Sequence, residues 1–177
     1  METFFTSDTH FGDHRVLNIR PRPFGSVSEM DEELVRHWNL RVGKRDTVWH
    51  LGDFASNTKT AQSIFRRLNG RKHLVAGNID RDGVRSLGWS SVQDYAELTL
   101  QGVSLVLCHY PFRTWNGIHR RAINLHGHSH GRLKPLRRQY DVGVDAHEFR
   151  PILLAELIGR RSGSVGLGCA DNRRLSN

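Results

Sequence analysis

Residues 3–10 read Thr3-Phe4-Phe5-Thr6-Ser7-Asp8-Thr9-His10, a short β-rich run that ends directly in an acid and a histidine. In an extended segment, residues two apart point the same way, so Asp8 and His10 can both reach one ion. A single Asp-x-His after a strand is more often a turn or a cap than a metal site. Its meaning therefore depends on whether other strands in the chain end in the same way.

Four further apolar runs do end in such residues, namely Gly52-Asp53, Gly77-Asn78-Ile79-Asp80, His109 and Gly127-His128-Ser129-His130. Up to the third piece, strand-like and helix-like runs alternate in the order β-α-β-α-β. Open α/β sheets place their ligands outside the carboxyl ends of the strands, which is where each polar piece lies. The pattern predicts an α/β fold whose polar residues gather at one sheet edge.

The helices between these strands are marked by apolar residues at helical spacing. The first follows a loop rich in Pro and Gly, starts near a capping pair formed by Ser28 and Asp31, and buries residues between 30 and 42. The second extends to Leu68 and stops at Asn69-Gly70.

The second half of the chain is richer in strands. A strand over 91–100 is expected to pair with one over 103–108, and closing strands are expected at 140–144 and 152–157. From Gly159 the composition turns to Gly, Ser, Arg and Asn. We therefore predict one folded domain over residues 1–158 and a weakly ordered tail over residues 159–177.

The chain of 177 residues carries 26 Lys and Arg against 18 Asp and Glu, a net charge of +8 that favours anionic partners. Basic pairs such as Arg120-Arg121 and Arg137-Arg138 are spread along the sequence, however, which is more typical of a solvated surface than of a nucleic-acid track. No run approaches the ~18 apolar residues of a membrane span, and the chain starts as a core strand rather than a signal peptide. We expect a cytoplasmic protein with no membrane partner.

Taken together, the five pieces predict a centre for two divalent metal ions. Two ions about 3.5–4 Å apart need a bridging carboxylate and further ligands that converge from several strands. Asp53 is the natural bridge, because Gly52 before it lets the backbone turn sharply. The other predicted ligands are Asp8, His10, Asn78, His109, His128 and His130. Mixed imidazole and oxygen ligands suit Mn, Fe, Zn, Co or Ni, among which Mn is favoured.

In this order, the pieces D-x-H, G-D, G-N-x-D, H and G-H-x-H resemble those of the calcineurin-like metallophosphoesterase superfamily, from Phe4 to about Pro151. Residues 5–12 and 125–131 are similar to its small single-domain bacterial and phage members. The resemblance implies a four-layer α/β/β/α sandwich with the metals at its edge. It implies that the first metal is held by Asp8, His10, Asp53 and His130. It implies that the second is held by Asp53, Asn78, His109 and His128.

The chain departs from that family at Ile79, where many members carry a histidine that helps to protonate the leaving oxygen. Isoleucine can neither donate a proton nor bind a phosphate, and the loss of a general acid commonly costs 10²–10⁴-fold in rate. Diesters and activated esters should suffer least. Asp80 is a catalytic candidate, although an N-cap for a short helix over 81–87 is the favoured interpretation. His14 is the best candidate among the histidines for a substitute acid.

Four other residues lie close to predicted ligands. His50 is expected to be structural, and His126 is expected to hydrogen bond to a ligand. Arg81 and Arg113, together with Asn78, are candidates for substrate binding because guanidinium matches the geometry of phosphate. For each arginine, a surface salt bridge is an equal alternative.

The sequence therefore predicts a dimetal-dependent phosphoesterase in which a hydroxide bridging the metals attacks the phosphoester. Coordination can lower the pKa of water from 15.7 to about 7, which makes such a nucleophile available at neutral pH. The missing acid and the positive charge favour a phosphodiester of nucleotide or nucleic-acid type over a phosphoprotein. The alternative is a catalytically idle metal-binding scaffold on the same fold, which Ile79 favours and the seven intact ligands disfavour.

Overall fold

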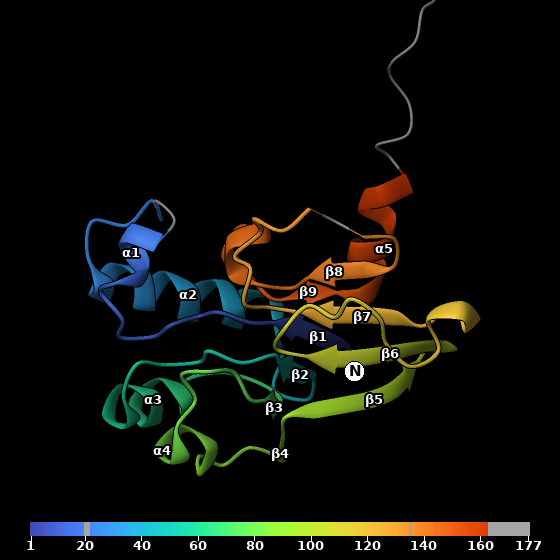
Figure 1. Ribbon diagram of the computed structural model, residues 1–177. Helices are drawn as coiled ribbons and strands as arrows, with labels where there is room; N and C mark the ends of the chain where they lie inside the picture. Colours follow the sequence, from blue (N-terminus) through green and yellow to red (C-terminus); the bar gives the residue numbers. More distant parts are fainter. Residues whose placement is uncertain (20–21, 135, 163–177) are drawn as a thin grey trace, which may run out of the picture.

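Two β-sheets packed face to face form the centre of the molecule, and the larger helices lie beside the first of them (Figure 1). The computed structural model describes residues 1–19, 22–134 and 136–162. The predicted α/β class, with two sheets between its outer layers, is confirmed.

The first sheet contains the strands that precede the first three polar pieces. It has the order β4-β3-β2-β1-β9, formed by β1 (Thr3–Thr6), β2 (Thr47–His50), β3 (Arg71–Val75), β4 (Ser91–Gln93) and β9 (Ile152–Leu153). Strands β1 to β4 pair in parallel, while β9 runs antiparallel to β1. Parallel pairing brings the carboxyl ends of β1, β2 and β3 to one edge, so the residues that follow them meet there.

The second sheet supplies the other two ligand-bearing strand ends. It has the order β5-β6-β7-β8, formed by β5 (Tyr95–Leu100), β6 (Val103–Cys108), β7 (Ile123–His126) and β8 (Gln139–Asp141). Strands β5 and β6 form an antiparallel hairpin, and β6, β7 and β8 are parallel. The carboxyl ends of β6 and β7 therefore lie at the same edge of this sheet.

The described chain has five α-helices and two 3-10 helices, of which all but α5 lie in connections between strands. They are α1 (Val16–Ile19), α2 (Val27–Arg41), α3 (Thr58–Phe65), α4 (Asp82–Arg85), α5 (Leu154–Ser162), η1 (Ile118–Arg120) and η2 (Val144–Ala146). Within the part of the chain that the structure describes, none of these helices has the length and apolar character needed to cross a membrane.

Helix α2 begins two residues earlier than the sequence suggested. Its N-cap is Ser26, whose Oγ accepts a hydrogen bond from the amide of Glu29 at 3.1 Å, so the predicted capping pair of Ser28 and Asp31 is wrong. Asp31 instead accepts the amide of Gly12 at 3.1 Å. This hydrogen bond ties the helix to the loop that follows β1.

The alternation of side chains along β1 places neighbouring phenylalanines in two separate cores. Successive strand residues point to opposite faces of a sheet. Phe4 packs against α2, in a cluster that includes Leu34 and Trp38. Phe5 packs between the sheets, in a cluster that includes Leu107 of β6. The two cores fix the first sheet from both faces.

A loop with a short 3-10 helix covers the outer face of the second sheet. Val106 on β6 packs there against Trp115 and Ala122, with Ile118 of η1 beside them. These covering residues belong to the connection between β6 and β7. Over this sheet, the outer layer of the expected sandwich is thus loop and 3-10 helix rather than a long α-helix.

Two predicted strands differ in the structure. The run over 91–100 is split at Asp94, so that β4 joins the first sheet and β5 the second. The closing strand over 152–157 ends after two residues, because α5 begins at Leu154 and buries Leu154 and Leu157. The boundary predicted after residue 158 falls inside α5, and residues 163–177 of the predicted tail lie outside the described residues.

We expect the buried face of α2 to carry much of its contribution to stability. Leu34 is 2% exposed and Leu40, on the same helix, is 71% exposed. Leu34→Ala should lower the free energy of unfolding by about 2–5 kcal/mol, because it removes buried methyl groups and leaves a cavity. Leu40→Ala, with the same change in helix propensity, should stay within about 0.5 kcal/mol of the parent. Urea denaturation measures both, and similar losses in the two variants would contradict the assignment.

Candidate metal centre

The five polar pieces meet where the strands of both sheets end. Beyond β1 and β2 the chain stays paired, since the amide of Asp8 donates to the carbonyl of Gly52 at 2.9 Å and the amide of His10 to the carbonyl of Asp53 at 3.0 Å. The amide of His128 arrives from the second sheet and donates to the Asp8 carboxylate at 3.0 Å. These contacts join residues that lie up to 120 positions apart in the sequence.

Five of the seven predicted ligands have left-handed backbone conformations. The φ angles are 56° at Asp8, 51° at His10, 58° at Asp53, 65° at His128 and 49° at His130. This region is uncommon for residues other than glycine, although Asp and His enter it more readily than most. A reversal of this kind directly after a strand ends the ladder and leaves the side chain at the sheet edge. Such strained conformations cluster at functional sites.

Close approach of the loops requires glycine directly before Asp53. Gly52 has a φ of 92°, and a Cβ on it would lie 2.5 Å from the amide nitrogen of Gly77 and 2.6 Å from Nδ1 of His109. Any side chain at this position would push the loops apart. The inference that Gly52 permits a sharp turn is confirmed, and the tight packing adds a second reason for glycine.

Two groups of donor atoms form in this space. The ligand atoms of one group lie within 4.8 Å of one another, and so do those of the other; the groups are Asp8, His10 and His130, and Asp53, His109 and His128. Oδ2 of Asp53 is 3.6 Å from Nε2 of His10 and 3.6 Å from Nε2 of His109. One carboxylate oxygen therefore lies near a donor of each group, which is the position that a bridging ligand needs.

The second group also contains the predicted amide ligand. Oδ1 of Asn78 lies 3.0 Å from Nε2 of His109 and 3.1 Å from Nδ1 of His128. Nδ1 of His109 donates to the carbonyl of Leu51 at 2.8 Å, which leaves its Nε2 available as a ligand atom. The chain thus gathers the other six predicted ligands around Asp53.

The two groups differ in their access to solvent. Asp8, His10 and His130 are all at most 5% exposed, whereas Asn78 and His128 are exposed. The centre is therefore closed at the first group and open at the second.

The first group fits a cation because it contains a buried imidazole without a hydrogen-bond partner beside a buried carboxylate. Neither ring nitrogen of His10 has a hydrogen-bond partner within the described chain. Burial raises the pKa of Asp8 to about 7 and lowers the pKa of His10 to about 4, so it favours the neutral form of both. A divalent ion would compensate an ionised Asp8 and would use the neutral imidazole of His10 as a ligand.

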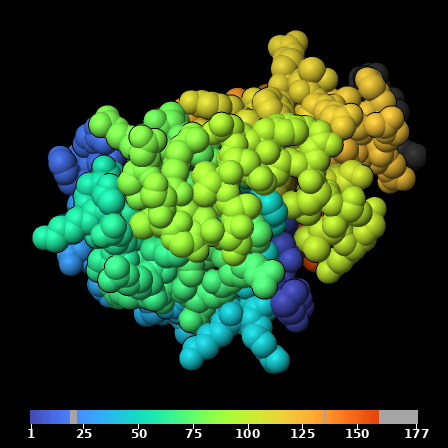
Figure 2. Space-filling view, turned by 90° about the horizontal axis from the view of Figure 1, so that it is seen from below, coloured from blue at the N-terminus to red at the C-terminus, as the bar shows by residue number. Residues whose placement is uncertain are grey.

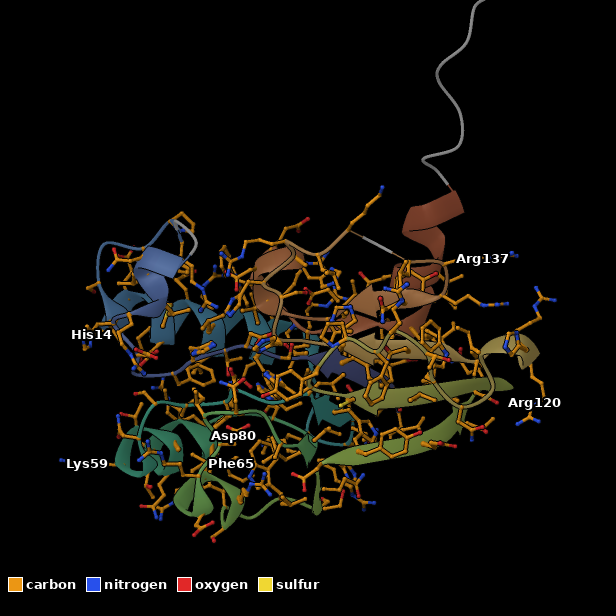
Figure 3. The ribbon with its side chains drawn as sticks, viewed as in Figure 1. His14, Lys59, Phe65, Asp80, Arg120 and Arg137 are labelled. Atoms are coloured by element: carbon orange, nitrogen blue, oxygen red, sulfur yellow. The ribbon has the colours of Figure 1, made fainter. Side chains whose placement is uncertain are left out.

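Asp80 holds the two loops of the second group together. Its Oδ2 accepts the amides of Asp53 and Gly77, each at 2.8 Å, and its Oδ1 accepts the amide of Phe54 at 2.9 Å. The predicted N-cap role is wrong, because the N-cap of α4 is Arg81 and no side chain caps that helix. Asp80 is 4% exposed, and its carboxylate joins the Gly-Asn loop to the Gly-Asp loop through these bonds; Figure 3 labels this residue in the interior of the molecule.

Arg22 and Asp145 support the first group, and the sequence reasoning missed both. Nδ1 of His130 lies 2.7 Å from Oδ2 of Asp145, which directs Nε2 of this ring toward the centre. Burial alone would lower the pKa of His130, but the bond to Asp145 and the charge of Asp8 raise it. Arg22 donates to both Asp145 oxygens, at 2.9 and 2.8 Å, and also to the carbonyls of Asp8 and Thr9.

Arg22 therefore ties the Asp-x-His loop to the carboxylate that orients His130. Its side chain has no exposed surface, which is rare for arginine and is accompanied by a full set of partners. The sequence gives little indication of the roles of these two residues. Arg22 lies in a Pro-rich loop, and Asp145 lies 123 positions away.

His14, Arg81 and Arg113, which were predicted for acid catalysis and substrate binding, lie on the surface, unlike the buried Asp80. His14 is exposed at the outer edge of the molecule, and neither donor group includes it (Figure 3). Arg81 and Arg113 are also exposed, and neither forms an ion pair among the described residues. The surface salt bridges that were the alternative for these arginines are thus not formed within this part of the chain.

Two further histidines near the ligands have structural partners. His50 is fully buried, and its Nε2 shares a hydrogen bond of 3.0 Å with Oγ1 of Thr9, which confirms a structural role. His126 is also buried, but its Nδ1 bonds to the carbonyl of Gly127 at 2.9 Å. The prediction that His126 holds a ligand side chain is therefore wrong, since it holds the backbone of the ligand loop instead.

Comparisons with known proteins give a consistent result. The family model of the calcineurin-like phosphoesterase superfamily domain matches residues 1–143. The Gene 66 protein of Mycobacterium phage D29 is 34% identical in an alignment 185 residues long, gaps included, and the alignment covers 84% of this chain and 91% of the relative. An uncharacterised protein of Methanocaldococcus jannaschii is 27% identical over 161 residues, covering 85% and 86%.

A solved structure extends the agreement to the fold. The crystal structure of a protein of unknown function from Aquifex aeolicus is 24% identical, with a TM-score of 0.73, and the alignment covers 89% of this chain and 98% of that one. Because the family model spans most of the folded chain and every ligand up to His130, this protein belongs to the calcineurin-like phosphoesterase superfamily.

Proposed function

We propose that this protein is a metal-dependent phosphoesterase that prefers phosphodiesters of nucleotide type to phosphoproteins. Membership of the superfamily supports phosphoester hydrolysis in general. The observation that carries the proposal is the position of Asp53, whose Oδ2 lies 3.6 Å from an imidazole nitrogen of each donor group. A single ion would need only one of these groups. We expect the protein to act in the cytoplasm.

The proposed ligand sets follow the two groups. Asp8, His10 and His130 would hold one ion, Asn78, His109 and His128 would hold the other, and Asp53 would bridge them. Divalent ions held there would activate water and neutralise charge on the phosphate oxygens. Mn²⁺ remains the favoured metal, among several that suit imidazole and oxygen ligands.

The chain's own groups would then bind and orient the ester. The exposure of Asn78 and His128 supports approach of the substrate from the second group. Arg81 and Arg113 are proposed to reach phosphate oxygens, since both are exposed and come from the loops after Asn78 and His109. The amide of Ile79 donates to Oδ1 of Asp53 at 3.1 Å, so this residue still orients the bridge through its backbone.

The absence of a histidine at position 79 supports the preference for diesters. Asp80 is occupied by three backbone amides, so we assign it a positioning role rather than proton transfer. His14, the predicted proton donor, lies at the outer edge of the molecule and outside both donor groups. Without a donor close to the centre, substrates with good leaving groups should react fastest, because they need the least help from an acid.

Asp53→Asn should abolish most of the activity. Loss of residues that merely orient ligands costs 10–100-fold, so we expect loss of the bridge to lower turnover of bis(p-nitrophenyl) phosphate with Mn²⁺ by at least about 100-fold. Asp82→Asn makes the same chemical change at an exposed carboxylate on α4 and should leave the rate unchanged. Equal turnover by parent and Asp53→Asn would refute the proposal.

Ile79→His tests the missing acid. A histidine here should raise turnover of phenyl phosphate at least about tenfold, and should change turnover of bis(p-nitrophenyl) phosphate much less, because its leaving group needs little protonation. The Ile79→Leu variant is the control for a change in side-chain shape. No difference between the histidine and leucine variants on either ester would contradict the assignment of this position.

The second candidate function is a metal-binding scaffold without activity, and Ile79 is the observation that favours it. The same measurements separate the two functions. Hydrolysis by the parent protein supports the enzyme. Two bound ions with no turnover by the parent, and turnover that begins only in Ile79→His, support the scaffold.

Asp145→Ala should lower the affinity of the first group for its ion without unfolding the protein. Removing a carboxylate that orients a metal-ligating histidine costs about 10–100-fold in affinity. Isothermal titration with Mn²⁺ should show one weakened and one unchanged site, and Asp145→Asn should recover part of the loss because its amide oxygen can still accept from Nδ1 of His130. Glu156→Ala breaks an ion pair with Arg41 elsewhere and is the control. Unchanged affinity in Asp145→Ala would contradict the proposal that Asp145 orients His130 for metal binding.

A further inference from the structure

The positive charge of this chain comes almost entirely from one stretch. Residues 98–140 contain seven Lys and Arg and no Asp or Glu, whereas the rest of the chain carries nineteen Lys and Arg against eighteen Asp and Glu. The basic pairs are spread along the sequence, but the acidic residues are not. The interpretation as a solvated surface considered the basic pairs alone and left the distribution of the acids out.

The seven basic residues lie in the two connections of the second sheet. They are Arg113, Arg120 and Arg121 between β6 and β7, and Arg132, Lys134, Arg137 and Arg138 between β7 and β8. We call these seven side chains the basic track. Because β6, β7 and β8 are parallel, each connection must run from the ligand edge of the sheet back to the opposite edge. That distance is about 20 Å for the six residues of β6.

The two connections lie side by side. Nη2 of Arg138 donates to the carbonyl of Ile118 at 3.0 Å, and Nε2 of Gln139 to the carbonyl of Phe112. In Figure 2 the gold surface of these segments gathers at one end of the molecule. Figure 3 shows Arg120 and Arg137 projecting outward there, at the end opposite Lys59.

The charges of the basic track are available to a partner. Six of the seven side chains are exposed, Arg138 is half-buried, and none of the seven forms an ion pair among the described residues. Several arginines elsewhere are paired with acids, as in Arg36 with Glu33, Arg67 with Glu32 and Arg85 with Asp94. Other exposed basic residues outside the basic track, Arg45 and Lys59 among them, are also unpaired within the described chain, but that part of the sequence carries all eighteen Asp and Glu, whereas residues 98–140 carry none. A stretch whose charges share one sign is an electrostatic footprint for a polyanion.

The basic track begins at the open group of the metal centre. Arg113 follows His109 by four positions, and Arg132 follows His128 by four. Tyr110, directly after His109, is 46% exposed, and its ring centroid is 4.7 Å from that of His128. An exposed aromatic ring beside a phosphate-binding group is a platform on which a base can stack.

We propose that the basic track binds the sugar-phosphate backbone of a single-stranded nucleic acid and leads the strand to the metal centre. A run of unmatched cations along about 20 Å of sheet fits a chain of phosphates better than a single nucleotide. The exposed ring of Tyr110 favours a strand with free bases over a duplex. That the bound strand is also the substrate rests on the proposed function; the binding itself does not.

Fluorescence anisotropy with a labelled oligothymidylate of about 20 nucleotides tests the basic track. EDTA is present throughout, so no metal-dependent hydrolysis can occur. Arg120→Glu with Arg137→Glu should weaken binding at least about tenfold at 50 mM salt, and should reduce the slope of log K against log salt by about 1.4, since each contact contributes about 0.7. Lys59→Glu with Arg66→Glu, which makes the same charge change on α3, should weaken binding less than about twofold.

Three results would overturn the inference. One is no binding by the parent protein in EDTA, and another is equal weakening in the two double variants, which would reduce the effect to net charge. The third is tighter binding to anionic phospholipid vesicles than to the oligonucleotide, because Leu133 is 46% exposed among the basic residues and could meet a membrane surface.

Turnover of bis(p-nitrophenyl) phosphate separates this inference from the proposed function. The Arg120→Glu/Arg137→Glu variant should hydrolyse this small ester at the parental rate with Mn²⁺ while it hydrolyses the oligonucleotide at least about tenfold more slowly at subsaturating concentration. Binding without any hydrolysis by the parent would leave the basic track standing and remove the proposed function. Hydrolysis of the small ester without oligonucleotide binding would do the reverse.

Discussion

The Asp80 carboxylate accepts hydrogen bonds from three backbone amides. The geometry of the candidate metal centre depends on these bonds, because they hold two of the ligand loops in place. Five predicted ligands occupy left-handed backbone conformations. Each strained backbone conformation of this kind costs about 1–3 kcal/mol of folding free energy. Their sum is comparable to the whole net stability of a domain of this size, about 5–15 kcal/mol. The loops therefore need partners that hold them. Asp80 does so for the second group, and Arg22 with Asp145 does so for the first.

The two donor groups differ in burial and in their access to solvent. The first is enclosed, and burial favours the neutral forms of Asp8 and His10 until a cation is present. An ion held there is integral to the local structure, because its removal leaves buried polar atoms without compensation. The second group faces solvent through Asn78 and His128, so an ion held there and a substrate would share one opening. We infer that the first ion exchanges more slowly than the second.

The sequence was sufficient to predict which side chains meet at the sheet edge, because each predicted ligand follows closely on a recognisable strand. Parallel strand order then brings them to one edge without any knowledge of side-chain packing. The residues that support them could not be found in this way. Arg22 and Asp145 are paired across 123 positions, and Asp80 resembled an N-cap because a short helix does follow it. The division of 91–100 between two sheets was also invisible, since the pattern of a strand does not say which sheet it joins.

The chemistry of the ligands explains why the basic track can lie where it does. The first sheet supplies every predicted carboxylate and amide ligand, whereas the second supplies only His109, His128 and His130. An anionic strand that crosses the second sheet therefore meets imidazoles and arginines before it meets Asp53. Carboxylates on that side would repel the phosphates at short range, where screening by salt is weakest. The absence of acids over 98–140 and the neutral ligands of that sheet then act together, because both reduce the negative charge that a phosphate meets before it reaches Asp53.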